Sequence, residues 1–357
     1  MVYNSCLEKT EENYMADTKK EHYVPRCYLE NFEDNNGRIH VFDKVIIQTR
    51  NPKKEEIAHE NYFYDMDIEK LISDVPPEQR EKIINDIKEI TGCDDWDTIV
   101  TEIINPKHIE KKFFCEVEGV YGPLLKRIIQ NSYSGNQWVI DHCAPFSEDD
   151  KSMLSLFLAI QIIRTKAFRD SIHQISEKTF QTLLYKQQLN DEVSISREDI
   201  NVKANSEYIK LLHLDMILDE DMALEMAEVF SNHIWVMNVN KTSTPFYTSD
   251  NPVLTIPHIK DKYMTYGGYN SKGVEVVFPV SPNLLLSMYE KRQFSSYFND
   301  RSFRIIKDDT TVDYYNRVQV AQSFRCVFSN MNEFSIAKDM CDKYPEIRDP
   351  NNRITVC

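Results

Sequence analysis

The stretch SEYIKLLHLDMILDEDMALEMAEVFSNHIWVMNV, residues 206–239, holds the change of pattern that decides the fold class. Its first part has the apolar spacing of an amphipathic helix and predicts a helix over residues 206–231. Its last part, Ile234–Val239, is typical of a strand. Because helical spacing dominates before this point and strand patterns dominate after it, the sequence predicts an α+β protein.

Two more long helices are expected in the middle of the chain. Pro106 opens the first, which runs to about Ile129 with apolar residues three and four positions apart. Ser147 with Asp150 three residues later forms a capping box, and it begins a second helix that runs to about Tyr185. The polar stretch 189–204 separates this helix from the next and is the best candidate for an internal boundary.

Strands and shorter helices flank this helical middle. A turn at residues 35–37 precedes a strand over residues 39–42. Further strands are expected at 245–248, 274–280, 284–288 and 326–328, and further helices at 313–322 and 332–342. We therefore predict an α+β fold with a mixed N-terminal segment, a long-helix middle and a strand-rich C-terminal part that forms one antiparallel or mixed sheet. We expect one interleaved domain over residues 21–345, between tails at 1–20 and 346–357.

Charge and composition exclude several classes of protein. The 357 residues carry a formal net charge of −15, which disfavours indiscriminate binding of nucleic acid. No apolar run is long enough to cross a membrane, and the start lacks the pattern of a signal peptide. The eight scattered cysteines lack C-x-x-C spacing, which indicates reduced thiols and a cytoplasmic location. Motifs of P-loop, dinucleotide-binding and serine-hydrolase sites are also absent.

A buried ion pair is one candidate element of a site. Gln161 and Arg164 fall on an otherwise apolar face of the helix that begins at Ser147. Burying an unpaired cation costs several kcal/mol, so Arg164 needs a carboxylate, a phosphate or contact with solvent. Glu118 on the preceding helix could meet Arg164 if the two helices pack antiparallel. The pair would then be either a structural link or a carboxylate and guanidinium lining a polar cavity.

Two more candidate elements are short segments, the first of which directly follows an expected strand. Asp250 and Asn251 stand in the segment TSDNP, residues 248–252. These side chains could simply stabilise a turn ahead of the proline. Asp250 could instead be a metal ligand or a general base. His22 and Arg26 stand in the segment HYVPR (residues 22–26). The imidazole can titrate near physiological pH, and the guanidinium offers a planar fork of donors.

These motifs resemble, in the same order, those of the bacterial domain of unknown function 4238 family. The resemblance rests on HYVPR with Tyr28, Leu29 and Phe32, on the segment QIIRT at residues 161–165 and on TSDNP. It extends through FPVSP at residues 278–282 to Asn316, Gln322 and Arg325, and so covers roughly residues 20–330. Cys27 stands where the family has an aromatic residue, and Lys166 where it often has proline. The resemblance implies a soluble bacterial protein without an assigned activity.

Two functions from different classes suit the candidate residues, and a purely structural polar network is the third alternative. The first function is hydrolysis of a phosphodiester or nucleotide-type substrate in one polar pocket, formed by His22, Arg26, Glu118, Gln161, Arg164, Asp250 and Asn251. His22 would be the general acid or base, the arginines would bind phosphate, and the carboxylates would orient His22 or hold Mg²⁺ or Mn²⁺. The second function is a binding or sensor module without turnover. The partner would be an anionic small molecule or nucleic acid, or a protein; the sequence leaves the oligomeric state open and predicts no membrane contact.

Overall fold

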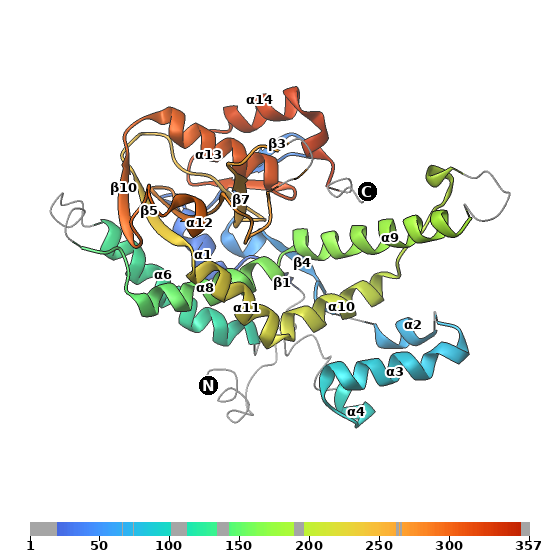
Figure 1. Ribbon diagram of the computed structural model, residues 1–357. Coiled ribbons are helices and arrows are strands. Elements are labelled where there is room, and N and C mark those ends of the chain that lie inside the picture. The colour runs from blue at the N-terminus through green and yellow to red at the C-terminus, as the bar shows by residue number, and fades with distance from the viewer. Residues whose placement is uncertain are drawn as a thin grey trace.

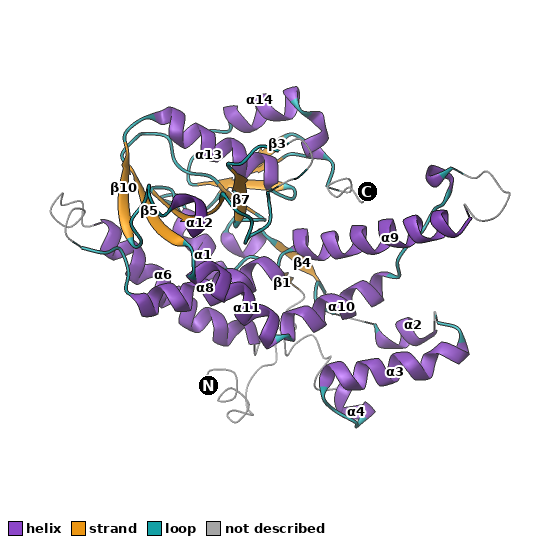
Figure 2. Ribbon diagram, viewed as in Figure 1, coloured by secondary structure: helices purple, strands orange, loops and turns teal. Residues whose placement is uncertain are grey.

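The sheets lie between two C-terminal helices and the helical middle of the chain in the computed structural model (Figures 1 and 2). The structure describes residues 20–65, 67–73, 75–100, 113–133, 143–188, 196–261, 264 and 266–350. The helices are α1 (Arg26–Leu29), α2 (Ile68–Ser73), α3 (Pro77–Thr91), α4 (Trp96–Thr98), α6 (Cys115–Tyr133), α8 (Glu148–Ile163), α9 (Lys166–Gln188), α10 (Ser206–Leu218), α11 (Glu220–Ser231), α12 (Lys291–Phe294), α13 (Asp309–Gln322) and α14 (Ser335–Lys343), with short 3₁₀ turns at η1 (Glu30–Phe32), η2 (Lys54–Glu56), η5 (Arg197–Asp199) and η6 (Pro345–Arg348). The predicted α+β class is confirmed.

The largest sheet has five strands in the order β10 (Ser302–Ile306), β5 (Ile234–Asn240), β9 (Leu284–Tyr289), β8 (Val274–Ser281) and β7 (Leu254–Pro257). Neighbouring strands are antiparallel except β10 and β5, which are parallel. Every residue of β5, β8 and β9 is buried. Because both faces of these strands are covered, they appear in the sequence as nearly continuous apolar runs.

The expected mixed sheet of the C-terminal part is present as this five-stranded sheet, but the strands near 248 and 326 join a second one, and the described residues form three sheets in all. A four-stranded sheet has the order β3 (Gln48–Arg50), β2 (His40–Asp43), β11 (Cys326–Ser329) and β6 (Thr248–Ser249), and β1 (Lys20–His22) pairs with β4 (His59–Asn61). Pro245 and Pro252 lie on either side of β6. Proline lacks an N–H donor, so these two prolines disfavour a longer ladder at this point, and β6 has only two residues.

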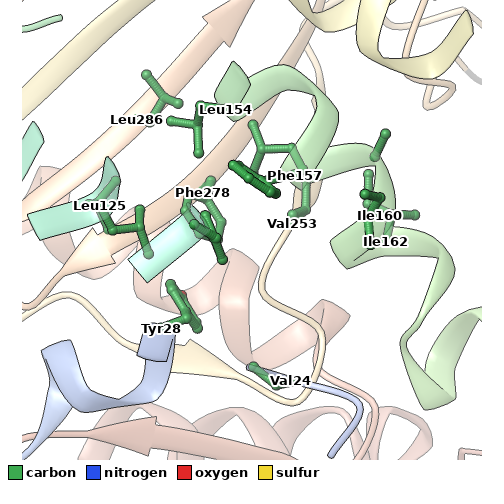
Figure 3. Packing of buried hydrophobic residues seen from close by; sticks show 14 of the residues in the cluster. Val24, Tyr28, Leu125, Leu154, Phe157, Ile160, Ile162, Val253, Phe278 and Leu286 are labelled. Atoms are coloured by element: carbon green, nitrogen blue, oxygen red, sulfur yellow. The ribbon is translucent and has the colours of Figure 1, made fainter. Parts of the chain in front are cut away.

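Helices α6, α8 and α11 supply the apolar side chains that cover one face of the five-stranded sheet. Leu154 and Phe157 of α8 belong to the same buried cluster as Phe278 of β8 and Leu286 of β9 (Figure 3). Full burial of a side chain of this size stabilises the fold by roughly 1.5–3 kcal/mol. Helix α8 therefore lies against the sheet and also packs against α11 and α6.

The predicted helix over residues 147–185 begins as expected but is interrupted. The Ser147 hydroxyl accepts a hydrogen bond from the Asp150 N–H, and the Asp150 carboxylate accepts one from the Ser147 N–H, which forms the predicted capping box. The helix then ends at Ile163, and Thr165 begins α9: its hydroxyl accepts a hydrogen bond from the Phe168 N–H. This local capping bond stops one helix and starts the next although the apolar spacing continues.

The predicted helix over residues 206–231 is also divided. Asp219 lies between α10 and α11, and its carboxylate accepts a hydrogen bond from the Met222 N–H. Of the predicted helix over residues 106–129, residues 106–112 lie outside the described chain, and α6 continues past Ile129 to Tyr133. In the described segments, no helix is long and apolar enough to span a membrane.

Helix α13 covers the other face of the five-stranded sheet and links it to the four-stranded sheet. Val312 and Tyr315 lie in a cluster with Val277 of β8. The Asn316 side chain accepts a hydrogen bond from the Tyr247 N–H just ahead of β6. At the end of the helix, the Gln322 amide forms two hydrogen bonds with the backbone of Thr255 on the edge strand β7. The late polar residues of the sequence thus join two sheets.

The expected tails lie largely outside the described residues. Residues 1–19 and 351–357 are not described, nor is most of the candidate boundary, residues 189–195. Part of the expected C-terminal tail is described and packed: in η6, Arg348 donates hydrogen bonds to the carbonyl groups of Lys44 and Val45. The Gln174 amide of α9 donates to the Pro350 carbonyl. The chain therefore stays attached to the domain as far as Pro350.

We expect His213 to make the protein more sensitive to acid. Its Nε2–H donates to the Ile163 carbonyl at the end of α8, 2.7 Å away, and burial lowers its pKa to about 3. Because the imidazole in the unfolded chain titrates near 6.5, stability is complete above that pH and falls as pH drops toward 3. Between pH 7.5 and 5.5 the wild type should lose about 1.4 kcal/mol more unfolding free energy than His213→Gln, measured by urea denaturation. Equal losses would show that His213 is not a buried neutral group.

Candidate functional site

The HYVPR segment crosses the centre of the structure rather than its surface. His22 ends β1, and Pro25 precedes α1, where its fixed φ suits a helix start. Tyr28 donates a hydrogen bond to the Pro279 carbonyl and lies 2.5 Å from the Thr248 hydroxyl, so this segment contacts the strand that carries TSDNP. His22 is buried, whereas Arg26 is exposed.

Arg164 joins this segment to the helices. The side chain is 1% exposed, and its Nη1 lies 3.1 Å from the Glu118 carboxylate. Its Nη2 donates to the His22 carbonyl at 2.6 Å, and its guanidinium carbon lies 3.9 Å from the centre of the Phe114 ring. The Gln161 amide donates to the Tyr23 carbonyl at 3.4 Å. The expected pairing of Arg164 with Glu118 is therefore confirmed, and its second contact is to backbone.

Asp250 fixes the loop that leads into β11. Its carboxylate accepts hydrogen bonds from the N–H groups of Phe324, Arg325 and Cys326 at 2.7–2.8 Å. Burial raises its pKa above the ordinary value, although these three donors and the nearby Lys44 ammonium counteract the rise. The polar atoms around Asp250 are thus backbone donors and one buried cation, and the loop from Phe324 to Cys326 has a single defined course.

Asn251 and Lys44 also stabilise the end of α13. The Asn251 amide donates to the Gln322 carbonyl. The Lys44 ammonium donates to the carbonyl groups of Val320 and Ser323, each 2.9 Å away. The last carbonyl groups of a helix lack partners within the helix and carry partial negative charge, so these donors are well placed there.

Tyr23 links the two groups of candidate residues. Burial raises its pKa well above the ordinary value; the neighbouring Asp250 and Glu60 raise it further, and Arg325 lowers it. Its carbonyl meanwhile receives the Gln161 hydrogen bond. The structure therefore brings the backbone of HYVPR close to both Arg164 and Asp250. Arg26 is exposed, and among the described residues its side chain forms no ion pair with this network.

An open pocket of about 550 Å³ lies beside this network. We call it the cationic pocket; its lining residues are Val45, Lys166, Asp170, Phe324, Arg325, Pro345, Arg348, Asp349 and Pro350. Lys166 directly follows the buried Arg164–Thr165 pair, while Phe324 and Arg325 stand on the loop that Asp250 holds. None of the candidate residues predicted from the sequence lines the pocket, but Arg164 precedes Lys166 by two residues and Asp250 holds Phe324 and Arg325 by hydrogen bonds.

Comparison with protein families identifies the chain. A family model described as a protein of unknown function, DUF4238, matches residues 20–333. The chain belongs to the DUF4238 family. Comparisons with curated proteins and with solved structures give no match.

The DUF4238 region supplies only part of the cationic pocket. Val45, Lys166, Asp170, Phe324 and Arg325 lie inside the matched residues, whereas Pro345, Arg348, Asp349 and Pro350 come after them. The family portion therefore provides two cations and the chain beyond it provides the third. In the sequence, Lys166 stands out only as a departure from the family pattern and Arg325 only as part of the resemblance, and nothing indicates Arg348.

The described residues also bear on the expected divalent ion. No group of three or more histidine, cysteine, aspartate or glutamate side chains in the described segments has the arrangement to hold a metal ion. His22 and His59 lie close, with ring centres 5.3 Å apart, and burial together with His22 and other nearby cations lowers the pKa of His59 to about 4. A neutral His59 imidazole is therefore present at neutral pH on the strand that also carries Glu60.

Proposed function

We propose that this DUF4238 protein binds a small anionic ligand in the cationic pocket. The observation that carries the proposal is the meeting of three cations from three separate segments, Lys166, Arg325 and Arg348, around one opening. Such side chains repel one another, so a protein places them together where an anion offsets the repulsion. This is the binding alternative expected from the sequence, with a different set of ligand-contacting residues.

Each of these cations has partners within the protein, and Asp170 and Asp349 line the same pocket, but the two arginines keep donors for a ligand. Arg348 donates to two carbonyl groups, which satisfy hydrogen bonds but carry no net charge. Arg325 binds the Asp43 carboxylate through Nε at 2.7 Å, yet its side chain is 47% exposed. Lys166 pairs with Glu60. A guanidinium has five donors, so both arginines retain capacity for a carboxylate or phosphate.

The residues expected to be catalytic would then act as positioning residues. Arg164 and Glu118 would fix the junction of α8 and α9 that presents Lys166, and Asp250 would fix the loop that presents Phe324 and Arg325. Binding sites need such support because a rotamer held by packing loses less entropy when a ligand binds.

Calorimetric titration with inorganic pyrophosphate and AMP tests the binding proposal. We expect both probes to bind, and we expect Arg325→Gln and Arg348→Gln each to weaken binding about tenfold, the effect of one lost charge-assisted hydrogen bond. Binding should also weaken at high salt. Arg317→Gln is the matched control: Arg317 forms an exposed ion pair with Asp339 and does not line the pocket. Failure of both probes to bind, or equal affinities in all three variants, would reject the proposal.

Hydrolysis of a phosphodiester remains the second candidate, favoured by the His22 and His59 pair. These residues lie on the paired strands β1 and β4, next to Glu60, the partner of the pocket residue Lys166. A turnover assay with RNA, DNA and nucleotides, with and without Mg²⁺ or Mn²⁺, separates the two functions. Turnover that His59→Gln abolishes without unfolding would favour the hydrolase, and binding without turnover would favour the module.

A further inference from the structure

We infer that the ligand of the cationic pocket is an anion attached to a flat apolar ring, of the size and chemistry of a nucleoside monophosphate. The inference rests on the proposed function and concerns which anion the site selects. Three features of the pocket lead to it: its size, its apolar wall and its carboxylates.

The pocket is too large for a simple oxyanion. Its volume of about 550 Å³ falls in the range of sites for small organic ligands, roughly 300–1,000 Å³. A water molecule in the liquid takes about 30 Å³, so inorganic phosphate would leave most of this space to solvent. A ligand that contacts all walls must have a body in addition to its anionic group.

Four of the nine lining residues are apolar, and these form the candidate contact for that body. They are Val45, Phe324, Pro345 and Pro350. Phe324 is fixed in place, because its N–H donates to Asp250 at 2.8 Å and the Lys166 ammonium lies 5.6 Å from its ring centre. Rigid proline and aromatic surfaces suit a planar ring, since contact with them costs little side-chain entropy.

The two carboxylates disfavour a ligand that is anionic throughout. Asp170 and Asp349 line the same pocket as the three cations. They would repel a polyphosphate, but a carboxylate can accept hydrogen bonds from sugar hydroxyl groups or from the amino group of a base. One anionic end together with several donor groups is the pattern of a nucleoside monophosphate.

The segment beyond the DUF4238 match would set this selectivity. Pro345, Asp349 and Pro350 belong to it, and they supply half of the apolar wall and one of the two carboxylates. The family portion supplies Lys166 and Arg325, which recognise negative charge without regard to the rest of the ligand. Arg348 of this segment and Val45 and Phe324 of the family portion complete the site, so both parts of the chain contribute to charge recognition and to the apolar wall.

Titrations of the full chain with pyrophosphate, ribose 5-phosphate and AMP test the inference. We expect AMP to bind at least about tenfold more tightly than ribose 5-phosphate, because only AMP contacts the apolar wall. Val45→Ser should weaken AMP binding about threefold or more and leave the affinity for ribose 5-phosphate unchanged. Ile46→Ser is the matched control, since Ile46 is the exposed neighbour that does not line the pocket. Asp349→Asn should weaken AMP binding and leave pyrophosphate binding equal or stronger.

The outcomes separate this inference from the proposed function. If ribose 5-phosphate or pyrophosphate binds as tightly as AMP, the site recognises anions and the inference of a ring is wrong. The inference of a ring is also wrong if Val45→Ser and Ile46→Ser affect AMP binding equally. Near-ultraviolet circular dichroism that matches the wild type shows that both variants are folded. If none of the three probes binds, the proposed function itself fails.

Discussion

Replacing Asp250 with alanine is expected to lower the free energy of unfolding by about 3–5 kcal/mol. The residue is 1% exposed and accepts hydrogen bonds from the N–H groups of Phe324, Arg325 and Cys326. Alanine leaves three N–H donors without their acceptor and the buried ammonium of Lys44 without the neighbouring carboxylate. Unsatisfied buried donors and charges are among the most costly defects in a folded protein.

Urea denaturation followed by circular dichroism measures this loss. The unfolding free energy of Asp250→Asn should lie between those of the wild type and Asp250→Ala. The amide retains one acceptor oxygen, but its N–H₂ group faces other donors. Asp339→Asn is the control: this aspartate is 39% exposed, and its ion pairs should be worth less than about 1 kcal/mol. If Asp250→Ala lowers the free energy of unfolding by less than about 1 kcal/mol, Asp250 does not have this structural role. A direct role of Asp250 on a substrate would then be favoured.

The sequence predicted those elements that are specified by residues close together in the chain. The capping box of Ser147 and Asp150 was recognised because both partners lie three residues apart. The breaks at Thr165 and Asp219 were missed although they also depend on local hydrogen bonds. In both places the apolar spacing continues across the break, so the helical period concealed a single capping residue.

Pairing between distant segments could not be predicted. The strand β2 pairs with β11, nearly 300 residues later, and nothing in either strand specifies that partner. The sequence also did not specify how the strands divide among sheets. The segment that contains β6 was therefore predicted as one more strand of a single sheet. Only the prolines at 245 and 252 indicated that it stood apart.

The candidate site shows what residue type alone can indicate. The polar residues on apolar faces, Arg164 and Asp250, were correctly recognised as needing partners, because a buried charge always does. Their partners, however, include the His22 carbonyl and a run of backbone N–H groups, which have no signature in a sequence. Arg348 reaches the pocket only because η6 folds back onto Val45. That placement depends on tertiary structure.

Replacing Arg164 with methionine is expected to be the second most damaging change, with a loss of about 3–5 kcal/mol of unfolding free energy. Methionine keeps much of the length of the side chain but removes the donors to Glu118 and to the His22 carbonyl. Arg164→Lys should lose less, about 2–3 kcal/mol, because lysine keeps the positive charge. Some loss remains, since one ammonium cannot reach both acceptors as the planar guanidinium does. Denaturation of both variants in urea, with Arg317→Lys as the exposed control, measures these losses.

A double-mutant cycle decides whether Arg164 serves the fold or the ligand. Glu118 is 19% exposed, so Glu118→Gln alone removes the carboxylate without leaving a cavity, and the guanidinium remains buried without its counter-charge. If the two groups balance each other, Arg164→Met combined with Glu118→Gln should be about 1–3 kcal/mol less damaging than the sum of the single changes. Losses that add within about 0.5 kcal/mol would show that Glu118 does not balance the cation. Arg164 is buried and does not line the pocket, so a fall in the affinity of Arg164→Lys for pyrophosphate would show that it positions Lys166 for the ligand.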